Sequence, residues 1–116
     1  MKFGHTEIFA KDTLKSKDFY VNVLGFEVEE IQNGKFVWMK FGDHTFLLRP
    51  GKKDQQTTEY KDSDIGFVFY TDELEKTRAE LISRGLEFKG TDGSDTCLTF
   101  TDPDGNWFQL VDPRHA

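Results

Sequence analysis

The sequence is poor in cysteine and in long apolar runs. Its single cysteine, Cys97, excludes a disulfide within one chain, which favours a reducing compartment such as the cytoplasm. No stretch approaches the roughly 18 consecutive apolar residues that a membrane-spanning helix needs. The first residues also lack the apolar core of a signal peptide. We therefore expect a cytoplasmic protein with no membrane partner.

Positive charge is also scarce. The chain has 15 Lys and Arg against 21 Asp and Glu, which gives a net charge of −6. A negative surface repels phosphate backbones, and no stripe of basic residues interleaves with aromatic ones, so we expect no nucleic-acid partner. The same charge is compatible with the attraction of a cationic small molecule.

Phenylalanine, in contrast, is abundant. Hydrophobic residues make up only 36% of the chain, but there are 12 Phe among them. Each buried aromatic side chain removes about 150–250 Å² from water, so few residues can build a large core. A chain of 116 residues suffices for one domain and is too short for two independent ones. We expect one folded domain with an aromatic core.

The first half of the chain follows the order strand, helix and three strands. Residues 3–10 predict a strand, and a helix follows over 13–24, with Asp12 as its N-terminal cap and Gly25 at its end. The Asn-Gly pair at 33–34 is typical of a tight hairpin turn. The three strands after the helix are expected at 26–31, 35–41 and 44–49.

The second half repeats this order. A strand is expected at 64–70 and a helix from Asp72 to Gly85, with a capping box between Asp72 and Glu75. A tight turn at 102–105 precedes the last strand. The three strands after the helix are expected at 87–89, 96–101 and 106–111.

The two halves match closely enough to indicate an internal duplication. Each has a strand, a capped helix, a closing glycine and three further strands, and each ends in a strand followed by a proline, Pro50 or Pro113. We therefore expect a single domain of two βαβββ modules, residues 1–50 and 64–116. The polar stretch 51–63 is interpreted as the linker between them.

Three stretches carry a family resemblance. His5 is followed by KSKDFYVNVLGFEV at 15–28, FVFYTDELEKTRAELISRGLEF occupies 67–88, and TDPDGNWFQLVDP occupies 101–113. The Asp-Pro-Asp-Gly-Asn turn of the third is the most specific. Together these stretches resemble the glyoxalase/bleomycin resistance protein/dioxygenase (vicinal oxygen chelate) superfamily. The resemblance implies an α+β fold in which two tandem βαβββ modules place curved mixed sheets around a central cleft, and it implies a homodimer.

The resemblance also implies four positions for a divalent metal, on the first and last strands of each module. These positions hold His5, Phe46, Gly66 and Gln109. Phe46 and Gln109 are aligned through Pro50 and Pro113, and Gly66 is aligned through Leu74 and Gly85. Only the imidazole of His5 is a strong metal ligand. At the fourth position the neutral amide of Gln109 replaces the Glu that is usual there. We therefore expect no metal cofactor. The alternative is one divalent ion held by unusual ligands, namely His5, Glu7 (or Asp64 in its place) and Gln109.

Alternation along the strands predicts which residues line the cleft. The predicted ligand-binding residues are His5, Glu7, Phe46, Leu48, Val68, Tyr70, Thr99, Trp107 and Gln109, with Met39 and Val111 beside them. The opposite faces, under the helices, are expected to carry Ile8, Leu47, Phe67, Phe69, Phe108 and Leu110. An aromatic cleft with few polar groups suits a flat small molecule. The simpler alternative is that these aromatic rings only fill the seam between modules or a dimer contact.

Three functions remain open at this point. The first is a protein that binds a small aromatic or cationic molecule without a metal. The second is a divalent-metal-dependent lyase, isomerase or dioxygenase of the same superfamily. The third is an interaction domain without a small-molecule site, because a fold alone does not settle function.

Overall fold

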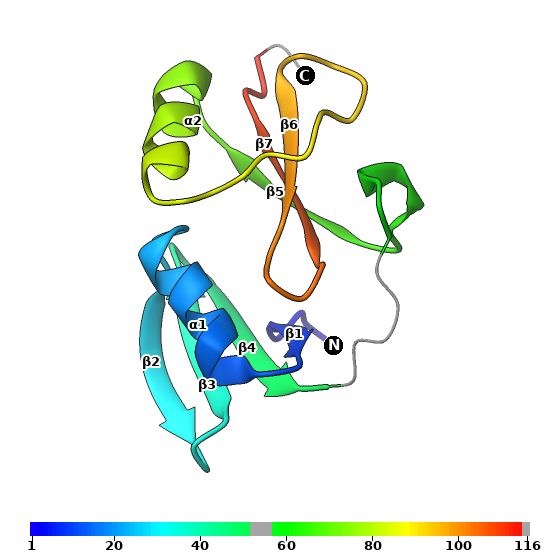
Figure 1. Ribbon diagram of the computed structural model, residues 1–116. Helices are drawn as coiled ribbons and strands as arrows, with labels where there is room; N and C mark the ends of the chain where they lie inside the picture. The colour runs from blue at the N-terminus through cyan, green and yellow to red at the C-terminus, as the bar shows by residue number, and fades with distance from the viewer. Residues whose placement is uncertain (52–56, 115–116) are drawn as a thin grey trace. The chain divides into compact units, whose positions relative to one another are not determined.

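The chain divides into two units, Met1–Asp54 and Gln55–Ala116, of which the computed structural model describes residues 1–51 and 57–114 (Figure 1). Each unit contains one of the two predicted modules. No helix in the described part of the chain is long and apolar enough to span a lipid bilayer.

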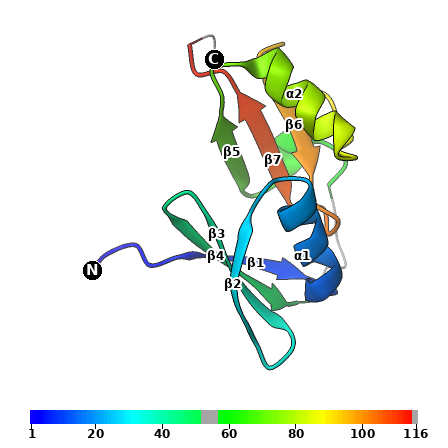
Figure 2. The ribbon, with the colours of Figure 1, turned by 90° about the vertical axis from the view of Figure 1, so that its left-hand side faces the viewer.

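Unit one has the predicted order of one strand, one helix and three strands. Its sheet has the order β1-β4-β3-β2, in which β1 runs parallel to β4 and the other neighbours are antiparallel. The helix lies against one face of this sheet (Figure 2). The elements are β1 (Thr6–Ala10), α1 (Thr13–Asn22), β2 (Glu27–Gln32), β3 (Phe36–Phe41) and β4 (His44–Pro50).

Local sequence signals explain the boundaries of unit one. The Asp12 carboxylate accepts a hydrogen bond from the backbone N–H of Lys15 at 3.2 Å and so caps α1, as predicted. After the helix, Gly25 adopts a φ of 84°. Asn33 and Gly34 both have positive φ, at 53° and 68°, in a tight turn where the Lys35 N–H donates to the Gln32 carbonyl at 3.1 Å. The predicted cap and hairpin are therefore confirmed.

Unit two has a smaller sheet than predicted. Its order is β5-β7-β6, with β5 parallel to β7 and β6 antiparallel to β7. The strand expected at 87–89 is not formed as a regular strand, although Lys89 N–H donates to Thr99 C=O at 2.7 Å and Thr99 N–H donates to Gly90 C=O at 2.9 Å. The elements are η1 (Tyr60–Asp62), β5 (Gly66–Tyr70), α2 (Leu74–Ser83), β6 (Cys97–Thr101) and β7 (Trp107–Val111).

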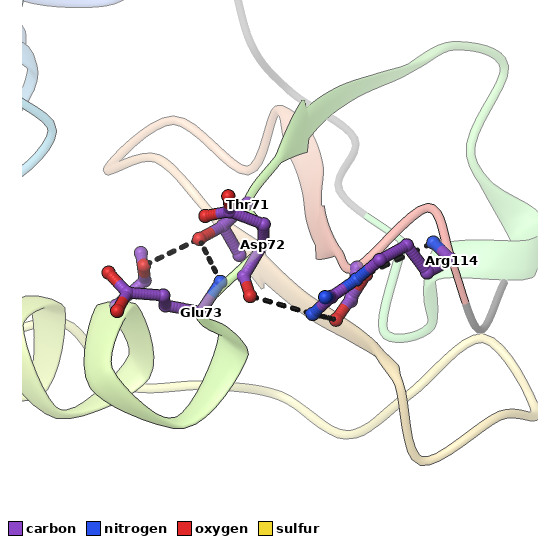
Figure 3. Close-up of polar contacts among 6 residues, drawn as sticks. Thr71, Asp72, Glu73 and Arg114 are labelled. Carbon is purple, nitrogen blue, oxygen red and sulfur yellow. Dashed lines mark hydrogen bonds and ion pairs between the residues drawn. The ribbon is translucent and has the colours of Figure 1, made fainter.

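The start of α2 differs from the predicted capping box. The helix begins after Glu73, whose backbone N–H donates to the Thr71 hydroxyl at 3.1 Å, so a threonine organises this turn instead of Asp72 (Figure 3). Arg114 donates to the Asp72 carbonyl at 2.7 Å and to the carboxylate of Asp112. The segment after β7 is thereby attached to the loop that precedes α2.

The turn before β7 is held by a buried carboxylate. Asp102 accepts hydrogen bonds from the backbone N–H groups of Asp104 and Asn106, both at 2.9 Å, and from the Asn106 side-chain amide at 2.8 Å. Gly105 has a φ of 83°, which favours glycine. The predicted tight turn is confirmed, and it fixes where β7 begins.

Aromatic residues form the core of each unit. In unit one, Tyr20 of α1 contacts Phe26, which contacts Phe46 of β4, with ring centroids 5.1 Å apart in both pairs. In unit two, Phe108 is fully buried beneath other phenylalanine rings. The rings that surround it belong to Phe67, Phe69 and Phe100.

Candidate functional site

The strand register of unit one corrects the predicted site. In the parallel pair β1–β4, Glu7 is the partner of Leu47, and Ile8 is the partner of Leu48. Paired residues of neighbouring strands point to the same face of a sheet. Leu48, and with it Phe46, therefore lies with Ile8 on the face that α1 covers. Their placement beside His5 and Glu7 was wrong, and Leu47 lies on the Glu7 side instead.

The error arose from the alignment through Pro50 and Pro113. In unit two the corresponding register pairs Val68 with Gln109, so the counterpart of Gln109 in unit one is Leu47. Relative to its first strand, the last strand of unit one is therefore shifted by one residue from the position that the proline alignment gives. A shift of one residue moves every side chain of a strand to the other face.

The other face of the first sheet contains residues that the sequence did not indicate. Trp38 of β3 pairs with Leu47, and its ring meets the His5 ring edge-on at a centroid distance of 4.8 Å. Met39, expected in the cleft, pairs with Phe46 and is buried on the helix side. We call this surface the open face of the first sheet; it carries His5, Glu7, Trp38, Leu47 and Arg49.

Glu7 is held by two partners on this open face. Arg49 Nη1 donates to Glu7 Oε1 at 2.7 Å, and His5 Nε2 lies 2.9 Å from Glu7 Oε2. The Arg49 hydrogen bond, and then that of His5, holds the pKa of Glu7 below its ordinary value of 4.5. The Arg49 guanidinium also lies 5.8 Å from the ring centroids of Phe9 and Phe36. Glu7 therefore does not present an unbalanced negative charge to a ligand.

This arrangement predicts a pH-dependent contribution to stability. Because folding lowers the Glu7 pKa, the interaction stabilises the chain above a pH of 4.5, and this contribution is lost as the pH falls through the folded-state pKa. Glu7→Gln cannot ionise. It should lower the thermal unfolding midpoint near neutral pH and leave it almost unchanged near pH 2, as measured by circular dichroism.

The exposed Glu30 of β2 supplies the control. Glu30→Gln should change the midpoint by a similarly small amount at both pH values. If Glu7→Gln destabilised the protein equally at both pH values, the charge of Glu7 would not be the source of its effect.

The second sheet places its predicted site residues on one face. The register pairs Val68 and Thr99 with Gln109, and Tyr70 with Val111, so the expected alternation is confirmed here. Their exposure differs: Tyr70 is 74% exposed and Thr99 is fully buried, its hydroxyl donating to the Lys89 carbonyl at 3.0 Å. Thr99 therefore serves the packing of the sheet.

Tyr60, a residue of the expected linker, lies on this same face. The Gln109 side-chain amide Nε2 donates to the Tyr60 hydroxyl at 2.8 Å, and the Tyr60 ring meets Trp107 edge-on at 6.0 Å. Trp107 Nε1 donates to the Thr57 hydroxyl at 2.9 Å. The later part of the expected linker thus belongs to unit two, and residues 52–56 lie outside the described residues.

Gly66 and Gln109 complete this surface. A Cβ atom at position 66 would collide with the Tyr60 hydroxyl, so the glycine makes room for a ring of the same chain. Gln109 Oε1 is buried and has no hydrogen-bond partner among the described residues. An unpaired buried oxygen costs free energy, which a ligand that donates a hydrogen bond would recover.

The residues at the family's metal positions fit a metal ion poorly. With the corrected register these positions hold His5, Leu47, Gly66 and Gln109, of which Leu47 and Gly66 offer no side-chain ligand. Within residues 1–51 and 57–114, no three His, Cys, Asp or Glu side chains come together as a metal-binding group. His5 is engaged by Glu7, and the Gln109 nitrogen is engaged by Tyr60.

Several solved structures share this fold. An integron cassette protein from the mobile metagenome of the Halifax Harbour sewage outfall is 22% identical, with a TM-score of 0.71 and coverage of 97% of this chain and 99% of that one. Lactoylglutathione lyase from Agrobacterium tumefaciens is 17% identical, with a TM-score of 0.71 and coverage of 97% and 94%. The fosfomycin resistance protein FosX from Listeria monocytogenes, solved as a mutant with Mn(II) and 1S,2S-dihydroxypropylphosphonic acid, is 18% identical, with a TM-score of 0.73 and coverage of 95% and 88%.

A comparison with curated proteins finds no match. The model of the Glyoxalase/Bleomycin resistance protein/Dioxygenase superfamily matches residues 2–110. This match spans nearly the whole chain and both units, and it agrees with the shared fold. The chain therefore belongs to the glyoxalase/bleomycin resistance protein/dioxygenase superfamily.

Proposed function

We propose that this protein binds a small aromatic molecule on the second sheet, beside Gln109, without a metal ion. The observation that carries the proposal is the surface around Gln109. There a buried indole, Trp107, lies beside an amide whose oxygen has no partner among the described residues. Aromatic area with a few fixed polar groups is the usual composition of a small-molecule site.

The expected preference for a cationic ligand needs revision. Glu7 is the acidic residue among the predicted ligand-binding residues, and Arg49 and His5 occupy both oxygens of its carboxylate. A cation would have to compete with the Arg49 guanidinium. We therefore propose an aromatic ligand without a required positive charge.

A metal-dependent lyase, isomerase or dioxygenase is the second candidate. The FosX structure with Mn(II) favours it, because this fold holds a metal in that protein. In the present chain the ion would need His5, Glu7 and Gln109 as ligands. Arg49 would then have to leave the Glu7 carboxylate, and Tyr60 would have to release Gln109.

Ligand-induced stabilisation tests the proposal. Chelator-treated protein should show a raised thermal midpoint with some members of a panel of small aromatic compounds. At a hundredfold excess over Kd the stabilisation should be about 2.7 kcal/mol. Trp107→Leu should abolish the effect, whereas His44→Ala, at the exposed first residue of β4, should preserve it.

The other outcomes separate the alternatives. Stabilisation that requires added Mn²⁺ or Zn²⁺ would contradict the proposal and favour the metal enzyme. No stabilisation by any compound, with or without metal, would leave an interaction domain. The homodimer that the family resemblance implies stays a prediction, which sedimentation equilibrium would check.

A further inference from the structure

The side chain of Tyr60 covers the surface around Gln109 on the second sheet. Its hydroxyl accepts a hydrogen bond from Gln109 Nε2 at 2.8 Å, and its ring lies edge-on to Trp107 at 6.0 Å. The phenol oxygen also fills the space that a side chain at position 66 would take. A phenol is thus already bound to this surface, as a side chain.

The phenol of Tyr60 does not pair with every hydrogen-bonding group of this surface. It uses the nitrogen of the Gln109 amide, whereas Oε1 stays buried without a hydrogen-bond partner among the described residues. A molecule that presents an oxygen acceptor and a neighbouring N–H or O–H donor on one aromatic ring would satisfy both ends of the amide. Such a molecule would gain a hydrogen bond that Tyr60 does not make.

Only the side chain of Tyr60 needs to move. Its backbone belongs to the short helix η1, where its carbonyl accepts hydrogen bonds from the Ser63 hydroxyl at 2.7 Å and from the Ser63 N–H at 3.1 Å. These bonds do not involve the phenol. Tyr60 is only half-buried, so its ring can rotate into solvent while η1 keeps its conformation.

We infer that Tyr60 is an internal competitor for a ligand subsite formed by Gly66, Trp107 and Gln109, and that the ligand is a phenol-like ring with a hydrogen-bond donor next to its oxygen. The inference rests on the proposed function and names the chemical class of its ligand. Self-occupancy lowers apparent affinity in proportion to the fraction of molecules in which the subsite is free. Removal of Tyr60 should therefore raise affinity.

Calorimetric titration of the full chain with 2-aminophenol, phenol and toluene tests this inference. Tyr60→Ala should bind 2-aminophenol at least about tenfold more tightly than the wild type, if Tyr60 fills the subsite in nine molecules of ten or more. The order of affinity should be 2-aminophenol, phenol and then toluene. Adding Gln109→Leu to Tyr60→Ala should abolish both the gain and the preference for 2-aminophenol over toluene.

The matched variant Tyr60→Phe keeps the ring and loses only the hydroxyl. It should show a smaller gain than Tyr60→Ala, and it serves as the test if the alanine variant does not fold. An unchanged affinity in both variants, or equal binding of toluene and 2-aminophenol, would overturn the inference and make Tyr60 a packing residue.

The two proposals fail in different ways. If the wild type binds an aromatic ligand whose affinity does not depend on Tyr60 or Gln109, the proposed function stands and the internal competitor is rejected. If neither the wild type nor any Tyr60 variant binds any aromatic compound, both proposals are rejected. If Tyr60→Ala binds 2-aminophenol through Gln109, the inferred subsite stands.

Discussion

Phe108→Ala should lower the unfolding free energy of unit two by about 3–5 kcal/mol, as expected for removal of a fully buried aromatic ring. Phe108 has no exposed surface, and its ring lies 5.2 Å from Phe67, 5.6 Å from Phe69 and 5.3 Å from Phe100 between centroids. Its loss would leave a cavity bordered by three rings, two of them on β5 and one on β6.

Urea unfolding followed by tryptophan fluorescence measures this effect. Trp38 and Trp107 belong to different units, so single-tryptophan variants report on each unit separately. Phe3→Ala is the matched control, because Phe3 is 83% exposed and its removal should change the unfolding free energy by no more than about 0.5 kcal/mol. A loss below about 1 kcal/mol for Phe108→Ala would contradict the assigned core.

Asp102→Ala should be the second most damaging change, with a loss of at least about 2 kcal/mol. The Asp102 side chain accepts hydrogen bonds from the backbone N–H groups of Asp104 and Asn106, and the residue is only 3% exposed. Each buried donor left unpaired costs roughly 1–3 kcal/mol. Since this turn sets the start of β7, the change should also displace Trp107 and weaken aromatic ligand binding.

A second turn aspartate provides the control. Asp92 accepts one backbone hydrogen bond, from Ser94 at 3.2 Å, in an exposed loop, so Asp92→Ala should cost less than about 1 kcal/mol. Thermal and urea unfolding of both variants give the comparison. Equal losses for the two variants would show that burial of the Asp102 network contributes nothing beyond an ordinary turn.

Local signals explain why most of the fold was predictable. The Asn33-Gly34 hairpin, the Asp12 cap and the Asp102 turn each depend on residues within four positions along the chain. Strand alternation also gave the correct face for β5 and β7. In β5 exposed positions separate the half-buried Phe67 and Phe69, and in β7 Gln109 separates the buried Phe108 and Leu110.

The face of the sheet to which each β4 side chain points could not be predicted in the same way. Phe46, Leu47 and Leu48 are all buried, so the strand has no alternation of apolar and polar residues from which a face can be assigned. The proline alignment then supplied a phase that was wrong by one residue. Only the register with β1 corrects it.

Long-range pairing explains the other omissions at the candidate site. Arg49 meets Glu7 across 42 positions, and Tyr60 meets Gln109 across 49. No local pattern marks either pair. Gly66 could have been a signal, since a glycine within a strand often marks the close approach of another group, here the Tyr60 ring.

We propose that this member of the superfamily binds its ligand without a metal ion. Elemental analysis of protein purified without chelator, before and after addition of Ni²⁺, Mn²⁺, Fe²⁺ or Zn²⁺, tests it most directly. We expect far less than one tightly held ion per chain under every condition, with aromatic ligand binding unaffected by chelation. One ion per chain, lost in His5→Ala, would establish a metal centre and refute metal-free binding.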